Sequence, residues 1–182
     1  QQAIDANLAH VYRIQKSAIL DEAALVAGYS NIAKIYTDLD LSSVAVSYWH
    51  KALEATQRAT NNSLTKGPIL SELINCYLWQ EEPAKALQVL KENTSGTEKE
   101  LAGSWAQVYL KNNQLDSARK YATIAQTIAK KEGKFSFANE WMLIELALAK
   151  KQYAVVDELV MKCLDGKFQL ENKQRAQLYY AL

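Results

Sequence analysis

Apolar residues recur at steps of three and four along most of the chain, the spacing of one face of an α-helix. The clearest stretch, residues 26–57, carries this pattern at Tyr29, Ile32, Ala33, Tyr36, Ala45, Trp49 and Ala52. The first four share one face of a first helix, and the last three share one face of a second. The polar segment 38–43 predicts a turn between them, with Asp40 or Ser42 capping the second helix.

The same pair of faces recurs three more times downstream. In the second copy, Tyr77 and Ala86 are nine residues apart, as Tyr36 and Ala45 are. The third copy consists of Ala102, Trp105, Ala106, Tyr109, Ala118, Ala122 and Ala125. A more degenerate fourth copy consists of Leu143, Ile144, Ala147, Val156, Val160 and Cys163. The pattern therefore predicts four helical hairpins, at about 26–60, 67–95, 99–132 and 137–165.

Residues that favour helix ends fall between these faces. Pro83 suits the first turn of a helix, where a missing N–H costs nothing. Thr97 and Glu100 have the spacing of a capping box. Two asparagines in residues 111–114 predict a turn inside the third hairpin, and Gly133 separates the third hairpin from the fourth.

Both ends of the chain carry incomplete copies of the pattern. Ile4, Leu8 and Val11 form an apolar stripe, as the second helix of an earlier repeat would, within residues 1–19. Tyr179 and Leu182 fit the start of a further repeat within residues 170–182. Neither end has the polar face of a terminal repeat. We therefore expect a fragment of a longer protein, whose open ends would allow homodimerisation.

Composition and charge narrow the class of protein further. The chain is 49% hydrophobic but has only 6 glycines and 2 prolines, fewer than the many turns of a β-protein usually need. Its 21 basic and 20 acidic residues lack the excess charge of a nucleic-acid binder. No apolar run approaches the roughly 18 residues of a membrane span. No signal peptide is visible, and the cytoplasm and the periplasm both stay open as compartments.

Residues that carry chemistry are few and scattered. His10, His50, Cys76 and Cys163 share no spacing typical of metal ligands, and each cysteine falls on an apolar helical face. The sequence has no glycine-rich phosphate loop, no H-E-x-x-H and no G-x-S-x-G. We therefore expect no catalytic site, no metal and no cofactor. A lysine cluster at residues 130–134 suits a helix C-terminus, with a phosphate site as the alternative.

The seven-position pattern resembles the tetratricopeptide repeat, in which large, small and aromatic residues alternate in this order. Counting Val26 as position 1, position 11 is occupied by Tyr36, Tyr77, Tyr109 and Ala147, at spacings of 41, 32 and 38. The family period is about 34 residues, so the longer spacings resemble its extended bacterial variants. The resemblance implies an all-α, right-handed solenoid of antiparallel helix hairpins over residues 1–182. This solenoid would hold about four repeats and a partial repeat at each end.

The resemblance also implies a binding surface, because the first helices of such repeats line a concave groove. The groove residues it predicts are Asn31, Lys34, Asp38, Asn75, Trp79, Gln107, Lys111, Trp141 and Glu145. Amides can hydrogen-bond an extended peptide, and tryptophans serve as rigid anchors. The alternative is that Trp79 and Trp141 are packing residues. Ser30 and Lys34 depart from the family's carboxylate clamp, which disfavours the binding of chaperone tails.

These observations favour a protein-interaction module that binds a peptide or a partner helix in the groove. The alternative is a sensory or regulatory segment of a bacterial signalling protein or transcription regulator, with an output domain beyond Leu182. An enzyme with an unrecognised helical active site is a third hypothesis, and the missing catalytic motifs disfavour it.

Overall fold

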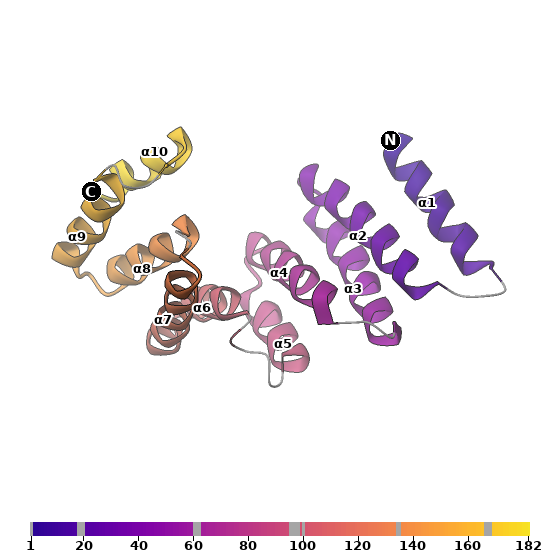
Figure 1. The fold of residues 1–182 in the computed structure, drawn as a ribbon, viewed down its shortest axis with the longest axis horizontal. Helices are drawn as coiled ribbons and strands as arrows, with labels where there is room; N and C mark the ends of the chain where they lie inside the picture. Colours follow the sequence, from indigo (N-terminus) through magenta and orange to yellow (C-terminus); the bar gives the residue numbers. More distant parts are fainter. Residues whose placement is uncertain are drawn as a thin grey trace. The chain divides into compact units, whose positions relative to one another are not determined.

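The computed structural model describes residues 2–17, 21–59, 63–94, 99, 101–133, 136–165 and 169–182, and in these the backbone forms helices and no strand (Figure 1). The helices are α1 (Gln2–Gln15), α2 (Glu22–Asp38), α3 (Ser42–Arg58), α4 (Ser63–Trp79), α5 (Pro83–Asn93), α6 (Ala102–Lys111), α7 (Leu115–Lys131), α8 (Phe137–Ala149), α9 (Tyr153–Leu164) and α10 (Asn172–Ala181). The predicted all-α class is confirmed. Consecutive helices pack on each other as in helical-repeat proteins, both among α1 to α5 and among α6 to α10.

The helices form two compact units. Unit 1 is Gln1–Asn93 and holds α1 to α5, while unit 2 is Thr94–Leu182 and holds α6 to α10. Each unit contains two of the four predicted hairpins. These are α2–α3 and α4–α5 in unit 1, and α6–α7 and α8–α9 in unit 2. The expectation of a single repeat domain over the whole chain stays a prediction.

All four hairpins close through the same three-residue turn. The middle residue of each turn has a left-handed φ; these residues are Asp40 (58°), Glu81 (57°), Asn113 (57°) and Lys151 (55°). The next residue donates its backbone N–H to the carbonyl of position 11. The donor and acceptor pairs are Leu41 and Tyr36 (2.9 Å), Glu82 and Tyr77 (2.9 Å), Gln114 and Tyr109 (2.8 Å), and Gln152 and Ala147 (2.9 Å). This Schellman-type bond satisfies a carbonyl that the helix leaves unpaired.

The turns correct one expectation and support two others. Neither Asp40 nor Ser42 caps the second helix of the first hairpin. Ser42 is the first residue of α3, and its N-cap Leu41 makes no side-chain bond to the helix. Pro83 begins α5, and the turn predicted within residues 111–114 separates α6 from α7. The proposed capping box of Thr97 and Glu100 lies outside the described residues.

Two helices start earlier than the pattern predicts. α2 begins at Glu22, because the Asp21 carboxylate accepts a hydrogen bond from the Ala24 N–H at 2.9 Å and caps the helix. α4 begins at Ser63 and includes Pro68. Both starts add a turn or more of helix ahead of the predicted repeats.

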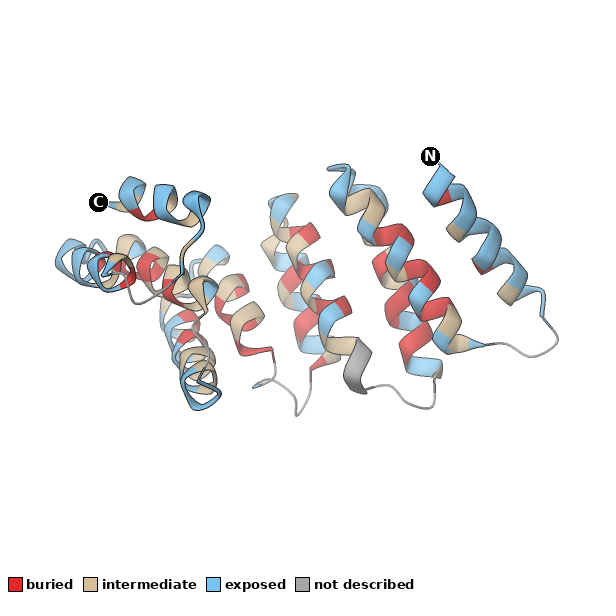
Figure 2. Cartoon of the chain, turned by 45° about the horizontal axis from the view of Figure 1, so that its top comes forward, coloured by how far each residue is buried: buried red, intermediate tan, exposed pale blue. Residues whose placement is uncertain are grey.

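Small residues sit where the two helices of a hairpin meet. Ala33 of α2 and Ala45 of α3 are fully buried, as are Ala106 of α6 and Ala118 of α7. In the described helices, buried residues lie on one side of each helix and exposed residues on the other (Figure 2). A larger side chain at these positions would overpack the interface. The small residues that mark the pattern are therefore those that permit close helix packing.

Gly28 provides a similar close approach between α1 and α2, and it generates a prediction. A Cβ at Gly28 would lie 2.6 Å from Cγ2 of Val11, a stiff and buried side chain. We expect Gly28→Ala to lower the free energy of unfolding by about 1–3 kcal/mol, the cost typical of overpacking. Urea unfolding followed by circular dichroism measures the change.

Gly67→Ala is the matched control, because Gly67 also lies inside a helix but a methyl group added there would meet nothing within 4 Å. It should raise the free energy of unfolding by about 0.5–1 kcal/mol through helix propensity. Adding Val11→Ala to Gly28→Ala should restore part of the lost stability. Equal effects of the two glycine substitutions would contradict the close contact between α1 and α2.

Candidate interaction surfaces

The first helices of unit 1, α2 and α4, each expose a stripe of residues spaced three or four apart. On α2 the stripe is Ala23, Ala27, Asn31, Lys34 and Asp38. On α4 it is Pro68, Glu72, half-buried Asn75 and Trp79. These stripes stay uncovered because the opposite faces of both helices supply the core, including Leu25 and Ile32 from α2 and Leu73 from α4. The five groove residues predicted in unit 1 all belong to them.

The amino-terminal halves of these stripes border a largely apolar hollow of about 360 Å³, here called the α2–α4 hollow. Its lining residues are Ala23, Val26, Ala27, Ser30, Trp49, Pro68, Ile69 and Glu72. Only Ser30 and Glu72 are polar, so the site suits an apolar group with a polar edge. Asn31 and Asn75 lie one helical turn or less further along the same helices, which places amides beside the hollow.

Trp49 of α3 forms one wall of the hollow, and hydrogen bonding fixes its position. Its indole N–H donates to Oγ1 of Thr37 at 3.3 Å, and that hydroxyl lies 3.7 Å from Sγ of Cys76. Burial raises the pKa of the Cys76 thiol, which therefore stays protonated. Cys76 is thus a small apolar core residue, as its position predicts. These contacts tie α2, α3 and α4 together and give the hollow a fixed wall.

The two predicted groove tryptophans have different environments. Trp79 ends α4 with 64% of its surface exposed. Trp141 is half-buried, stacks on Phe137 with ring centroids 6.1 Å apart, and packs against the core around Ile144. These contacts of Trp141 agree with the alternative interpretation, in which it packs within its own unit. Trp79 is thus the more exposed of the two tryptophans.

The four groove residues predicted in unit 2 lie on α6 and α8. Gln107 and Glu145 are half-buried, and Lys111 is exposed. Burial raises the pKa of the Glu145 carboxyl, opposed by attraction to Lys111 and by a hydrogen bond from the Trp141 indole. Lys111, Trp141 and Glu145 thus form a local cluster. In unit 1, the predicted groove residues Lys34 and Asp38 form an exposed ion pair, with 3.7 Å between Nζ and Oδ1.

Sequence reasoning missed most of the α2–α4 hollow. The prediction does not include Ala23, because the repeat pattern begins at residue 26, and the start of α2 depends on the Asp21 cap. It does not include Pro68 either, although Pro68 shares the exposed stripe of α4 with the predicted Asn75 and Trp79. The signal that could have found the first turn of α2 is Asp21 followed by Glu22, a typical helix start.

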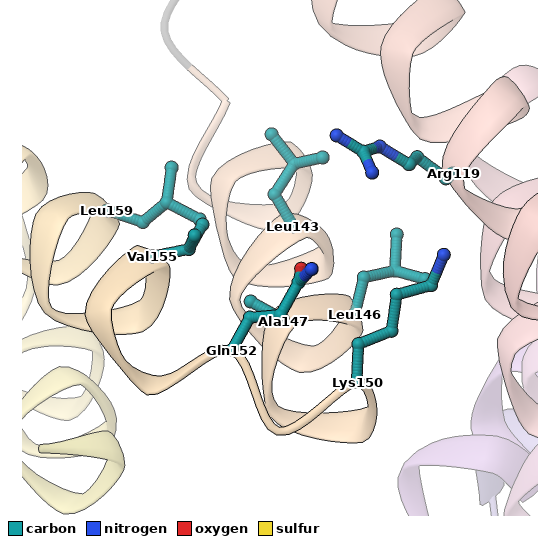
Figure 3. Close-up of a pocket in the computed structure, with 8 residues that line it drawn as sticks. All are labelled: Arg119, Leu143, Leu146, Ala147, Lys150, Gln152, Val155 and Leu159. Carbon is teal, nitrogen blue, oxygen red and sulfur yellow. The ribbon is translucent and has the colours of Figure 1, made fainter.

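A second hollow, of about 190 Å³, lies in unit 2 between α7 and α9 with α8 beneath it (Figure 3). Its lining residues are Arg119, Leu143, Leu146, Ala147, Lys150, Gln152, Val155 and Leu159. Arg119 and Lys150 lie on one side, and Val155 and Leu159 lie on the other. Nothing in the sequence pattern pointed to this hollow, here called the Ala147 hollow.

The described residues offer neither a metal site nor a membrane span. No group of three or more His, Cys, Asp or Glu residues in that part of the chain could hold a metal ion. None of the helices found there is both long and apolar enough to cross a membrane.

The comparisons with known proteins bear on the fold alone. No family model and no curated protein matches the sequence. The structure is similar to the crystal structure of BtubC (BKLC) from P. vanneervenii, with a TM-score of 0.65 and 17% sequence identity. The match covers 100% of this chain and 80% of the BtubC chain. At this identity the likeness supports the all-helical fold and carries no function.

The buried carboxyl of Glu145 generates a prediction about pH. Its pKa is raised in the folded protein, so the stability it contributes is present below the ordinary value of 4.5 and is lost as pH rises through the folded-state pKa. We expect Glu145→Gln to be more stable than the wild type at pH 7 and equally stable near pH 4. Urea unfolding across this range measures the difference.

The control for the loss of a negative charge is Glu158→Gln, which alters an exposed carboxylate on α9. It tests whether any change comes from the overall charge of unit 2. If Glu145→Gln is less stable than the wild type at pH 7, the interactions of the carboxylate with Lys111 and Trp141 stabilise the charged form by more than its burial destabilises it.

Proposed function

We propose that this chain binds a peptide or a helix of a partner protein along the face of unit 1 that α2 and α4 form. The observation that carries the proposal is the α2–α4 hollow, an open, mainly apolar depression on the surface of a folded unit. Apolar hollows edged by a few polar groups are typical binding sites. No catalytic constellation enters the proposal, which is one of binding.

An apolar side chain of the partner enters the hollow between Ala27 of α2 and Pro68 and Ile69 of α4. Burying a leucine- or phenylalanine-sized side chain contributes about 1.5–3 kcal/mol. Such a group acts as a hot spot because the surrounding walls exclude water from it. The fixed position of Trp49 keeps the cost of reorganisation low, since the wall needs no new contacts to form.

Polar groups beside the hollow set the orientation of the partner. The amides of Asn31 and Asn75 each offer a donor and an acceptor for a peptide backbone. At the carboxyl end of α4, the exposed ring of Trp79 offers a rigid apolar surface. The partner in this proposal therefore spans about the length of α4, with one apolar anchor and an aromatic contact further along.

The assignment of the hairpins to the tetratricopeptide class is part of the same proposal. The seven-position pattern of the sequence supports it, and so does the identical turn in all four hairpins. Proteins of this class commonly bind partners with their first helices, which in unit 1 are α2 and α4.

A displayed library of random twelve-residue peptides tests the proposal. Peptides selected on the wild type should share an apolar residue, and Ala27→Phe should weaken their binding by about tenfold or more because the new ring fills the hollow. Trp79→Ala should weaken it less. Isothermal calorimetry with the selected synthetic peptides measures each affinity.

Ala84→Phe is the matched control, since it adds the same ring to an exposed alanine on α5, a helix that contributes no residue to the α2–α4 hollow. It should leave affinity unchanged. Circular dichroism checks that the exposed substitutions keep the fold. Selected peptides that bind Ala27→Phe and Trp79→Ala as tightly as the wild type would refute this face as the site, and so would a selection that enriches no peptide.

A further inference from the structure

The Ala147 hollow occupies a place that a tyrosine ring fills in the other repeats. Position 11 is tyrosine in the first three hairpins and alanine in the fourth. In the first hairpin Tyr36 stacks on Tyr48, twelve residues later, with centroids 5.7 Å apart. In the third, Tyr109 stacks on Tyr121 at 5.6 Å. The same spacing therefore places a ring of position 11 against the second helix of its own hairpin.

The second hairpin shows the same ring reaching the preceding hairpin. Tyr77 is buried, and its hydroxyl lies 2.8 Å from Nε2 of His50 on α3. The fourth hairpin has Ala147 at this position and Leu159 twelve residues later, and both line the hollow. The fourth hairpin thus has smaller side chains at two positions that both carry tyrosine in the first and third hairpins.

The walls of the Ala147 hollow have a distinct charge. Its charged lining residues are both cations, Arg119 and Lys150, while Leu143, Leu146, Val155 and Leu159 supply aliphatic surface. Lys150 bonds Asp116 at 2.9 Å, but the Asp116 side chain is 99% exposed and faces solvent. None of the ion pairs found among the described residues includes Arg119, and Asp116, three residues earlier on α7, attracts it electrostatically from the solvent side. Arg119 is exposed at the edge of the hollow, where its guanidinium can meet an anion of a partner.

We propose that the Ala147 hollow binds an aromatic side chain of a partner peptide together with an adjacent carboxylate. The ring takes the space above Ala147 that tyrosine fills in the other hairpins, against Leu143 and Leu159. The carboxylate meets the Arg119 guanidinium, whose planar fork matches its geometry, and Lys150 adds a second positive charge. This site is independent of the α2–α4 hollow and lies in the other unit.

Charge complementarity selects this occupant over other peptides. A basic side chain would place a cation beside Arg119 and Lys150, which repel it. A small aliphatic side chain would leave part of the hollow unfilled and forfeit contacts that a ring makes. An acidic residue next to an aromatic one places a carboxylate at the two cations and a ring against the aliphatic side chains.

Methyl NMR titration of the whole chain with short blocked peptides tests the proposal. Acetyl-Glu-Phe-Glu-amide should shift the methyl signals of Leu143, Leu146, Val155 and Leu159 in a saturable way. Acetyl-Lys-Phe-Lys-amide and acetyl-Glu-Ala-Glu-amide should shift them little. Raising the salt concentration should weaken binding of the acidic peptide, because screening reduces the attraction.

Two variants and a control sharpen the test. Arg119→Ala should weaken binding of acetyl-Glu-Phe-Glu-amide by about tenfold, as expected for a hydrogen bond between charged groups. Lys120→Ala removes a neighbouring exposed cation of α7 and should have little effect. Ala147→Tyr should abolish binding, because the tyrosine restores the repeat pattern and fills the hollow.

The outcomes separate this site from alternatives. Equal responses to the acidic and basic peptides, or equal effects of Arg119→Ala and Lys120→Ala, would overturn the proposal even if Ala147→Tyr failed to fold. A dimer that forms through the exposed Tyr180 of a second copy, and is lost in Ala147→Tyr, would overturn the assignment to a partner peptide. Ala27→Phe should leave the methyl shifts unchanged, so failure here and failure of the α2–α4 hollow are distinguishable.

Discussion

The backbone bond from the end of each hairpin turn to the position-11 carbonyl is the constraint on which the remaining structure depends. It forces one turn residue into the left-handed region and lets the next helix start after only three intervening residues. With so short a connection the two helices must be antiparallel neighbours. Fully buried small residues such as Ala33 and Ala45 then become necessary, since large ones would hold the helices apart.

The two proposed binding surfaces lie where single positions depart from a constant framework. The α2–α4 hollow exists because the exposed stripe of α2 begins with small residues, Ala23 and Ala27, opposite Pro68. The Ala147 hollow exists because alanine replaces the position-11 tyrosine. The charged residues that line them differ in sign, since Glu72 borders the first hollow while Arg119 and Lys150 border the second. Each hollow lies within one unit, so each is complete without the other.

The hairpins could be predicted from sequence because their signals are local: helical periodicity, buried alanines and polar turns between them. The helix starts at Glu22 and Ser63 could not be placed by apolar periodicity, since the first depends on a cap at Asp21 and the second tolerates Pro68. The site was only partly predictable. The exposed stripe of α4 identified Trp79, but the packing of Trp141 against the core cluster around Ile144 depends on tertiary contacts. The Ala147 hollow could not be predicted, because in the sequence an alanine at position 11 only makes the fourth repeat match the pattern less well.

Native-state hydrogen exchange at the four turn amides tests the central claim most directly. The N–H groups of Leu41, Glu82, Gln114 and Gln152 sit outside the helices, yet each donates to a helix carbonyl. We predict that all four exchange far more slowly than unstructured peptide amides, with protection close to that of the adjoining helix ends. Exchange of Glu82 and Gln114 at the rate of an unstructured peptide would contradict a shared turn and the repeat built on it.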